Sequence, residues 1–487
     1  MSHYADWAVR ARVTEFLGGK ATGSNPTAVY FVTTDEDTHL RSGPRPFDEL
    51  SASLRQNLEI FRSLWDRESL LADLDIEYVN FDIPNLPYTK LERTFVLQEP
   101  LKREIQKALL GYGIAPLHLL SGSGHHFVWR IRRDSDCFAR LAHLGCMPSS
   151  LKDRYDQGTS RSGQKIDHTL GNAFIGLGRI IEYFAAEIKK RTAPILKLPI
   201  ELSPIEVGPG EHGREMLSFD ISQYADPLDA RFTRVAYSRY LKRRESSGTL
   251  TNQAGSSLPP LFVIPLYEMN ITEALQVMRE PKAVIALASY APAKIPNCSE
   301  GTENLLNSYL SSDLAQFHSD FYANEPEPPK RWPETYDRID FGQLPTCIQF
   351  FLQNPNELLL RPSIIRRVVI TLLSLGWHPR HIAGLIQSRF EHDFGWGNYW
   401  NSYDPAIKAE FFTRVFAGLV IGGYDDLIDF NCCSSQEQKI CFQADCQDNL
   451  EQFRMSLLNR RTYGRLARRP FHRLFLPEEH SDLSGNH

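Results

Sequence analysis

The sequence has no long apolar run and no excess of basic residues. Its apolar stretches are far shorter than the roughly 18 to 20 residues that a membrane-spanning helix needs. The N-terminal segment MSHYADWAVRARVTEF lacks the apolar core of a signal peptide. We therefore expect no membrane partner and a cytoplasmic, reducing location. The formal net charge is −5, so any contact with nucleic acid must use local basic patches.

The chain is too long for one typical hydrophobic core. It has 487 residues, of which 42% are hydrophobic and 23% charged, an ordinary composition for a globular protein. Two or three domains are expected at this length.

The eight cysteines are unevenly spread. In a reducing compartment they are expected to be thiols or metal ligands, not disulfides. Cys347 stands alone in QLPTCIQFF, whereas Cys432, Cys433, Cys441 and Cys446 crowd into NCCSSQEQKICFQADC. Four unrelated buried cysteines are the alternative, but this polar setting would make a poor core.

The pattern of apolar residues predicts an α+β half followed by a helical half. The predicted strands are 27–34, 70–79, 116–131 and 215–222, in a mixed or antiparallel sheet, and the predicted helices are 47–66, 101–113 and 175–191. A Ser-, Gly- and Pro-rich linker begins near residue 243. We divide the chain into a domain at 1–245, a linker and irregular or helical connector at 246–340, a mainly helical domain at 341–457, and a basic then polar tail at 458–487.

Three acidic residues alternate with apolar ones in LLADLDIEYV, residues 70–79. On a strand, Asp73, Asp75 and Glu77 share one face, where their like charges repel. The stretch is either a solvent-facing edge strand or a site for a hard divalent metal ion, which prefers oxygen ligands.

A Ser/Gly turn precedes two histidines in LSGSGHHFVWRI. Glycines let a backbone pass close to a phosphate, and free N–H groups can cradle it. Strand alternation puts His126 on one face with Arg130, and His125 on the other face. A hairpin turn with surface histidines is the alternative.

Basic residues follow a third acidic position in REMLSFDISQYADPLDARFTRVAYSRYLKRR. Asp220 comes after apolar residues on a predicted strand, and Arg231, Arg234, Ser238 and Lys242 follow it. This density of positive charge suits contacts to triphosphate or backbone phosphates. A solvated charged surface is the alternative.

In this order, the three elements resemble the archaeo-eukaryotic primase superfamily, which includes primase small subunits and primase-polymerases. The family's first motif, a strand with Asp-x-Asp or Asp-x-Glu, matches DIEY at Asp75 to Tyr78. Its second, a Ser/Gly-rich turn ending in Gly-x-His, selects His126. Its third, a strand acid trailed by arginines and a serine, matches Asp220 and the segment after it. The resemblance spans residues 27 to 245.

This resemblance implies a primase small-subunit-like catalytic domain, a mixed sheet with flanking helices, that performs two-metal phosphoryl transfer. Asp75, Glu77 and Asp220 would hold two Mg²⁺ or Mn²⁺ ions, and His126 would contact the incoming nucleotide's phosphates. The implied nucleotide- or template-binding residues are Ser121, Ser123, Gly124, Arg231, Arg234, Ser238 and Lys242.

Two metal-ligand assignments stay open. The strand pair could be Asp73 with Asp75 in place of Asp75 with Glu77. Some viral and plasmid members of the superfamily place the third acid in a segment like IDHTLGNAF, which makes Asp167 the alternative to Asp220. We favour Asp220 because the downstream arginines accompany it.

The second half resembles the C-terminal domain of the primase large subunit. LPTCIQFFLQNP is similar to that domain's Pro-Pro-Cys-Ile opening, with Thr346 in place of the second proline. In that family four cysteines bind a [4Fe–4S] cluster, and the matching residues are Cys347, Cys432, Cys441 and Cys446, with Cys433 as an alternative to Cys432. Four thiolates suit an iron–sulfur cluster or a structural zinc ion equally.

The two resemblances imply a DNA primase-polymerase that makes and extends primers on single-stranded DNA from NTPs or dNTPs. The fusion indicates a stand-alone enzyme of a bacterium or mobile element. A narrower expectation is a role beside replication or CRISPR adaptation proteins, of which the sequence gives no direct sign. The alternative is a non-catalytic single-stranded nucleic-acid-binding protein with a degenerate primase fold. A histidine-dependent nicking nuclease is disfavoured because adjacent histidines on a strand face opposite ways.

Overall fold

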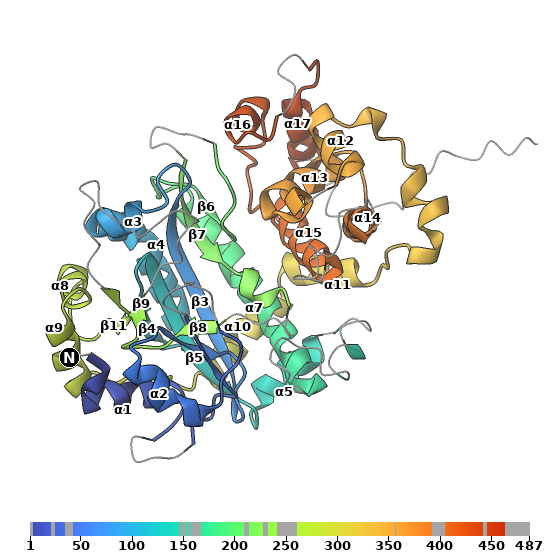
Figure 1. Cartoon of the computed structure of the whole chain (residues 1–487). Helices are drawn as coiled ribbons and strands as arrows, with labels where there is room; N and C mark the ends of the chain where they lie inside the picture. The colour runs from blue at the N-terminus through green and yellow to red at the C-terminus, as the bar shows by residue number, and fades with distance from the viewer. Residues whose placement is uncertain are drawn as a thin grey trace, which may run out of the picture. The chain divides into compact units, whose positions relative to one another are not determined.

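The computed structural model describes residues 3–20, 25–34, 42–145, 147, 152–153, 156, 167–208, 214–226, 232–240, 261–355, 357–391, 405–441 and 446–462. The chain forms two compact units (Figure 1). The first comprises Met1–Pro204 with Glu215–Ser308, and the second comprises Ile205–Arg214 with Tyr309–His487.

A six-stranded mixed sheet forms the centre of the first unit. In sheet order its strands are β11 (Ile264–Pro265), β4 (Leu117–Leu120), β5 (Gly124–Arg132), β3 (Ser69–Asn80), β7 (Glu215–Asp220) and β6 (Ile200–Glu201). The β6–β7 pair is parallel, and the other pairs are antiparallel. Pro265 lies on an edge strand, where its missing N–H is tolerated. The predicted α+β class and the strands predicted at 70–79 and 215–222 are confirmed.

One face of this sheet is apolar and is covered by two long helices (Figure 1). These are α4 (Leu91–Gly111) and α7 (His168–Thr192). Phe184 of α7 packs on Phe219 of β7, with ring centroids 6.2 Å apart. Phe95 of α4 meets His125 of β5 edge-on at 5.0 Å. The opposite face carries the acidic residues of β3.

A three-stranded antiparallel sheet lies in the same unit. Its strands, in sheet order, are β1 (Phe31–Thr33), β2 (Ile60–Ser63) and β8 (Phe232–Arg234). The helix predicted over 47–66 is wrong in its second half. Helix α2 (Leu50–Arg55) ends before Asn57, which adopts a left-handed backbone with φ of 60°. The apolar residues that follow pair as β2 between two other strands.

Further helices surround the two sheets. In the first unit they are α1 (Trp7–Phe16), α3 (Leu86–Thr89), α5 (Asp136–Leu144), α8 (Ile271–Val277), α9 (Pro281–Tyr290) and most of α10 (Ser299–Leu310). The ribbon of β9 (Arg239–Tyr240) and β10 (Leu261–Phe262) follows β8. Trp129 on β5 ties α10 to the sheet, because its indole N–H donates to Thr302 Oγ1 at 2.9 Å.

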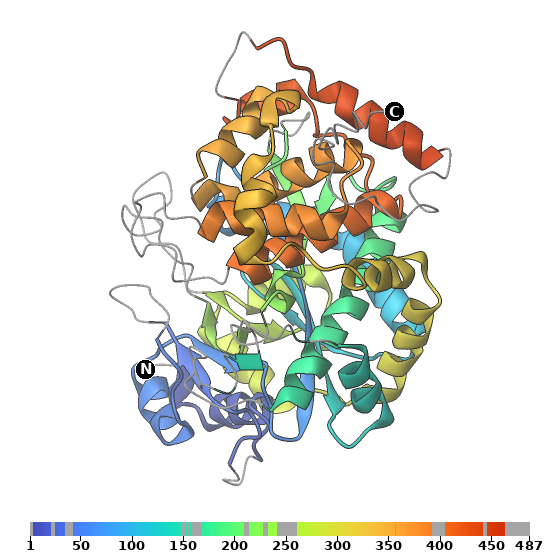
Figure 2. The ribbon, with the colours of Figure 1, turned by 90° about the vertical axis from the view of Figure 1, so that its right-hand side faces the viewer.

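The second unit is mainly helical in its described residues (Figure 2). Its helices are α11 (Asp313–Tyr322), α12 (Thr346–Gln353), α13 (Pro362–Ser374), α14 (Pro379–Glu391), α15 (Pro405–Ile421), α16 (Cys432–Glu437) and α17 (Leu450–Thr462). Helices α13, α14 and α15 pack together, and most of their residues are buried. A buried ion pair joins Arg366 of α13 to Asp425, with a nitrogen–oxygen distance of 2.7 Å.

The compact units divide the chain differently from the predicted domains. Residues 261–308, expected to belong to the connector, are part of the first unit, and residues 309–340 are part of the second. The predicted linker residues 246–260 and most of the tail lie outside the described residues. No described helix is both long and apolar enough to span a membrane.

Two buried histidines face each other on the apolar side of the large sheet. His118 Nε2 lies 2.9 Å from His125 Nδ1. Burial lowers the pKa of His118 to about 3 and that of His125 well below its ordinary value. Both rings are therefore neutral in the folded protein at pH values where the unfolded chain binds protons.

The free energy of unfolding should accordingly fall as the pH drops below about 6.5, by up to about 1.4 kcal/mol per pH unit for each such histidine. In His118→Gln, which keeps a hydrogen-bonding group beside His125, the decline should be shallower. Urea denaturation at a series of pH values measures it. His143→Gln, at an exposed histidine of α5, is the control. An identical decline in wild type and His118→Gln would contradict the prediction.

Candidate functional site

Three carboxylates of β3 lie on the face opposite α4 and α7. Asp73, Asp75 and Glu77 alternate with buried apolar residues along this strand. Asp75 is directly opposite His126 on β5 and directly opposite Asp220 on β7. Directly paired residues of neighbouring strands point to the same face. The structure thus brings the three sequence motifs together in one row across the sheet.

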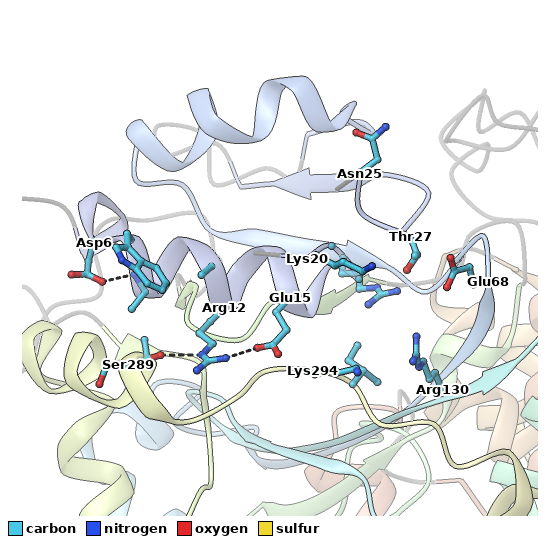
Figure 3. A pocket seen from close by; sticks show the side chains of 18 residues that line it. Asp6, Arg12, Glu15, Lys20, Asn25, Thr27, Glu68, Arg130, Ser289 and Lys294 are labelled. Atoms are coloured by element: carbon cyan, nitrogen blue, oxygen red, sulfur yellow. Dashed lines mark hydrogen bonds and ion pairs between the residues drawn. The ribbon is translucent and has the colours of Figure 1, made fainter. Parts of the chain in front are cut away.

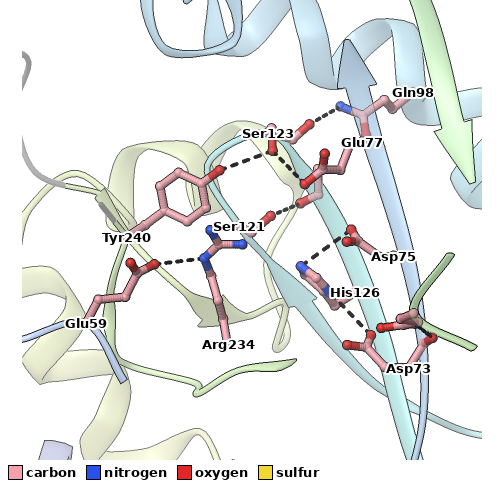
Figure 4. Close-up of polar contacts among 12 residues, drawn as sticks. Glu59, Asp73, Asp75, Glu77, Gln98, Ser121, Ser123, His126, Arg234 and Tyr240 are labelled. Atoms are coloured by element: carbon pink, nitrogen blue, oxygen red, sulfur yellow. Dashed lines mark hydrogen bonds and ion pairs between the residues drawn. The ribbon is translucent and has the colours of Figure 1, made fainter. Parts of the chain in front are cut away.

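His126 is held between two of the carboxylates (Figure 4). Its Nδ1 lies 3.2 Å from Asp73 Oδ1, and its Nε2 lies 3.6 Å from Asp75 Oδ1. Burial disfavours a charged ring, but attraction to Asp75 and Asp73 outweighs burial and raises the pKa of His126 to about 9. The ring therefore carries a positive charge at neutral pH. His125 faces the other side of the sheet, as strand alternation predicts.

Asp75 is at the centre of the acidic group. Its side chain is 21% exposed. Its Oδ1 is buried and has no hydrogen-bond partner among the described residues. Burial raises its pKa well above the ordinary value, and repulsion from Glu77, Asp73 and Asp220 acts in the same direction, against the attraction of His126. Four carboxyl groups thus share this face with one histidine, an arrangement that a bound cation would stabilise.

Asp220, and not Asp167, accompanies Asp75. Asp220 is 6% exposed and accepts a hydrogen bond from the Ser222 N–H at 2.9 Å. Asp167 is exposed, caps the N-terminus of α7 and pairs with Arg133. Arg133 follows the end of β5 remote from His126, roughly 20 Å along the strand. The alternative third acid is thus a helix cap far from the acidic group.

A cation from the three-stranded sheet faces the same site. Arg234 Nε donates to Glu59 Oε1 at 2.8 Å, and its guanidinium lies 4.2 Å from the ring centroid of Tyr240. Burial opposes the charge of Arg234, but Tyr240, Glu59 and Glu77 outweigh burial and raise its pKa. In Figure 4 the guanidinium lies between Glu59 and the side chains of the acidic strand.

Sequence reasoning predicted Arg234 but missed Glu59 and Tyr240. Glu59 directly precedes a strand that was predicted as helix. Tyr240 lies in the segment after Asp220, in which only basic residues and a serine were predicted site residues. No spacing rule in the sequence connects either residue to the acidic strand, since both reach it through strand pairing.

The Ser/Gly turn is buried. The Ser121 N–H donates to the Gly124 carbonyl at 2.9 Å and closes the turn. Ser123 Oγ donates to Glu77 Oε1 at 3.3 Å. Gly124 has no room for a side chain, because an added Cβ would lie 1.7 Å from a backbone carbonyl oxygen of β3. The turn therefore positions Glu77, and its expected contact with phosphate stays a prediction.

The remaining basic-segment residues are placed only in part. Ser238 lies in the turn between β8 and β9 and is fully buried. Its Oγ has no hydrogen-bond partner within the described part of the chain. Arg231 and Lys242 lie outside the described residues.

The donor types of the acidic group fit a hard divalent cation. Asp75, Glu77 and Asp220 offer only carboxylate oxygens, the ligands that Mg²⁺ and Mn²⁺ prefer. Asp75 Oδ1 is buried and makes no hydrogen bond with a described residue, and its charged neighbour is His126 Nε2 at 3.6 Å. Across the described ranges, no group of three or more His, Cys, Asp or Glu side chains is already arranged to hold a metal ion.

Four cysteines lie near one another in the second unit. Burial raises the pKa of the Cys347 thiol to about 11, the Arg367 guanidinium lowers it, and Cys441, Cys432 and Cys446 raise it further. The charges of these three thiols therefore act on Cys347 within the folded unit. Cys347 and the three cysteines of residues 432–446 thus interact electrostatically, although no three His, Cys, Asp or Glu side chains of the described residues are arranged to hold a metal ion.

The structure distinguishes Cys432 from Cys433. Cys432 Sγ accepts a hydrogen bond from the Leu450 N–H at 3.4 Å. Cys433 is exposed, and its Sγ lies 3.7 Å from Glu437 Oε1. Cys432 is therefore the member of the pair that belongs to the thiol group, whose donor type fits a [4Fe–4S] cluster or zinc.

Arg367 of α13 is a further residue of this group that sequence reasoning missed. It is 5% exposed, and its two terminal nitrogens donate to Ser435 Oγ at 2.6 Å and Gln438 Oε1 at 2.7 Å. These bonds hold a fixed positive charge next to the thiols, where it favours their deprotonated form.

No protein-family model, curated protein or solved structure matches this chain. Its function must therefore be inferred from its own residues.

The repulsion around Asp75 predicts that one carboxylate can be removed with a gain in stability. In the presence of a chelator, Asp220→Asn should raise the free energy of unfolding by about 1 kcal/mol, because it relieves repulsion and keeps an acceptor for Ser222. Asp167→Ala, which removes a helix cap, should lower it by about 1 kcal/mol. Chemical denaturation measures both variants. Equal destabilisation of the two would show that the acidic group carries no net repulsion.

Proposed function

We propose that the chain is a DNA primase-polymerase that synthesises and extends primers on a single-stranded DNA template by nucleotidyl transfer from NTPs or dNTPs. The observation that carries the proposal is the cross-strand row of His126, Asp75 and Asp220, with Glu77 two residues along the same face. A strand that bears several carboxylates beside one charged histidine is poorly explained as part of a core.

Asp75, Glu77 and Asp220 would hold Mg²⁺ or Mn²⁺ in this proposal. Bound divalent ions supply charge neutralisation for the triphosphate and a lowered pKa for the attacking 3′-hydroxyl. Asp73 stays with His126, because its Oδ1 is already the closer partner of the imidazole. This favours the Asp75 and Glu77 pair over the Asp73 and Asp75 pair.

His126 and Arg234 would bind the phosphates of the incoming nucleotide. Both are cationic at neutral pH and both approach the acidic group, His126 from β5 and Arg234 from β8. A triphosphate would lie between them and be oriented by charge-assisted hydrogen bonds. Glu59 holds the Arg234 guanidinium in place, so it acts as a positioning residue.

The second unit would contribute a metal centre held by Cys347, Cys432, Cys441 and Cys446. A [4Fe–4S] cluster or a zinc ion would bind the four thiolates and hold them together. A role in replication or in a defence system such as CRISPR adaptation is the wider context that we propose for such an enzyme.

The first test is primer synthesis on unprimed single-stranded DNA with labelled nucleotides and Mg²⁺ or Mn²⁺. Asp75→Ala should reduce product formation at least about 100-fold while leaving DNA affinity largely intact. His126→Ala should also lose activity. Asp134→Ala, at an exposed aspartate paired with Arg132, should retain it.

The same assay separates the proposal from the alternative of a non-catalytic binding protein. Absence of products with the wild-type protein, combined with tight single-strand binding, would place the chain in the binding class. Loss of DNA binding in Asp75→Ala would instead show that β3 contacts the strand directly or that the fold has been lost.

The cysteine centre makes a separate prediction. Protein purified without chelator should contain iron and sulfide, or zinc, in stoichiometric amounts. Cys347→Ser and Cys432→Ser should lose this metal and lower the melting temperature, because metal binding stabilises the folded unit. Cys433→Ser, at the exposed neighbour, should keep it. Elemental analysis and visible absorbance measure the content, and equal loss in Cys433→Ser would contradict the assignment.

A further inference from the structure

A cavity lies in the first unit, beside helix α1 and away from the acidic group (Figure 3). Its volume is about 960 Å³. It is lined by α1 and the turn after it, by the far part of β5, and by the segment that leads into α10. The Arg130 N–H donates to the Pro296 carbonyl at 2.9 Å, which holds this last segment, with exposed Lys294, against β5.

The lining of this α1 cavity is rich in positive charge. Five cationic side chains, Arg12, Lys20, Arg62, Arg130 and Lys294, and three anionic ones, Asp6, Glu15 and Glu68, line it. Two of the three acids are already used within the protein. Asp6 caps the N-terminus of α1, and Glu15 pairs with Arg12 at 2.9 Å and accepts the Ala293 N–H. Arg12 and Arg62 are likewise paired, with Glu15 and Asp66, and the excess of cations that remains, Arg130 and Lys294 against Glu68, favours an anion.

Arg130 is the strongest single indication of a ligand. Its Nε is buried and lacks a hydrogen-bond partner among the residues that the structure describes. Burial, and to a lesser degree the nearby charge of Arg130, lower the pKa of Arg62 to about 10 against the opposing effect of Asp66. The charge of Arg62 is balanced by its buried ion pair with Asp66. Arg130 forms no ion pair with a described residue, so it is the guanidinium that a bound anion would neutralise. Figure 3 shows Lys20, Lys294 and Arg130 around the same open space.

An exposed aromatic residue lies at the edge of the same cavity. Trp7, the first residue of α1, lines it and is 72% exposed. An indole at this exposure gains little from burial in the protein. Aromatic rings beside basic side chains are the combination by which proteins bind single-stranded nucleic acid, through base stacking and phosphate contacts.

The cavity and the acidic group are linked by one strand. Arg130 and His126 are four residues apart on β5 and point to the same face, so they are separated by about 13 Å along the strand. The two sites are therefore separated by a distance that a few nucleotides of an extended strand can span.

We propose that the α1 cavity is a second phosphate-binding site that holds a single-stranded polynucleotide, with Arg130 and Lys294 on its phosphates and Trp7 stacked on a base. Only the identity of this polynucleotide, as the template or primer on which the acidic group acts, rests on the proposed function. Binding at the cavity needs neither metal nor catalysis. A free nucleoside triphosphate is the alternative ligand, because it carries phosphates that the same side chains would bind.

The test is the affinity of the full chain for a labelled single-stranded oligonucleotide, measured by fluorescence anisotropy over a range of salt concentrations with a chelator present. Lys294→Glu and Arg130→Gln should each weaken binding about tenfold and reduce the salt-dependence slope by about one. Trp7→Ala should weaken binding by at least about fivefold with an unchanged slope. The matched control is Lys107→Glu, at an exposed lysine of α4, which covers the other face of the sheet.

Each outcome decides between the alternatives. Equal weakening by Lys294→Glu and Lys107→Glu would overturn the proposal, because only the overall charge would then matter. A second result would also overturn the proposal. If a free triphosphate displaces the oligonucleotide from the wild-type protein but not from Lys294→Glu, and Trp7→Ala has no effect, the cavity binds a free nucleotide. If Asp75→Ala binds the oligonucleotide as wild type does while Lys294→Glu does not, the cavity proposal is supported whether or not primers are made.

Discussion

The concentration of negative charge at the middle of β3 is the constraint on which the rest of the first unit depends. Asp73, Asp75 and Glu77 share a face with Asp220, and burial makes their repulsion costly. The strand tolerates them because His126 lies between two of the carboxylates and Arg234 approaches from another sheet. A site that opposes its own stability in this way is typical of a functional centre and not of a structural one.

The architecture around β3 serves to hold these charges at close range. On the apolar face, α4 and α7 anchor the sheet, which leaves the other face available for polar groups. The three-stranded sheet then supplies Arg234 together with its partner Glu59. Because the acids come from one sheet and the cation from another, the two sheets must fold together before the site exists.

In the second unit, ionisable thiols interact with one another and with a buried cation. Cys347 is the second residue of α12, whereas Cys432 begins α16 and Cys441 and Cys446 lie between α16 and α17. The buried Arg367 places a fixed positive charge near Cys347 and Cys432. A group of this kind is stable when the negative charge of the thiolates is balanced, by the guanidinium in part and by a metal centre in our proposal.

Local spacing in the sequence determined which face each residue of a strand occupies, because side chains alternate with a period of two. It therefore predicted that the acids of β3 lie together and that His126 and His125 separate. Only the tertiary structure decided which distant residues stand opposite them. Pairing of β3 with β7 places Asp220, and not Asp167, opposite Asp75. A hydrogen bond from the Leu450 N–H and the exposure of Cys433 distinguish Cys432 from Cys433. Helix α2 ends before the left-handed Asn57, and β2 then pairs with β8, next to which Glu59 meets Arg234. These choices depend on contacts between residues far apart in the chain, which no local pattern encodes.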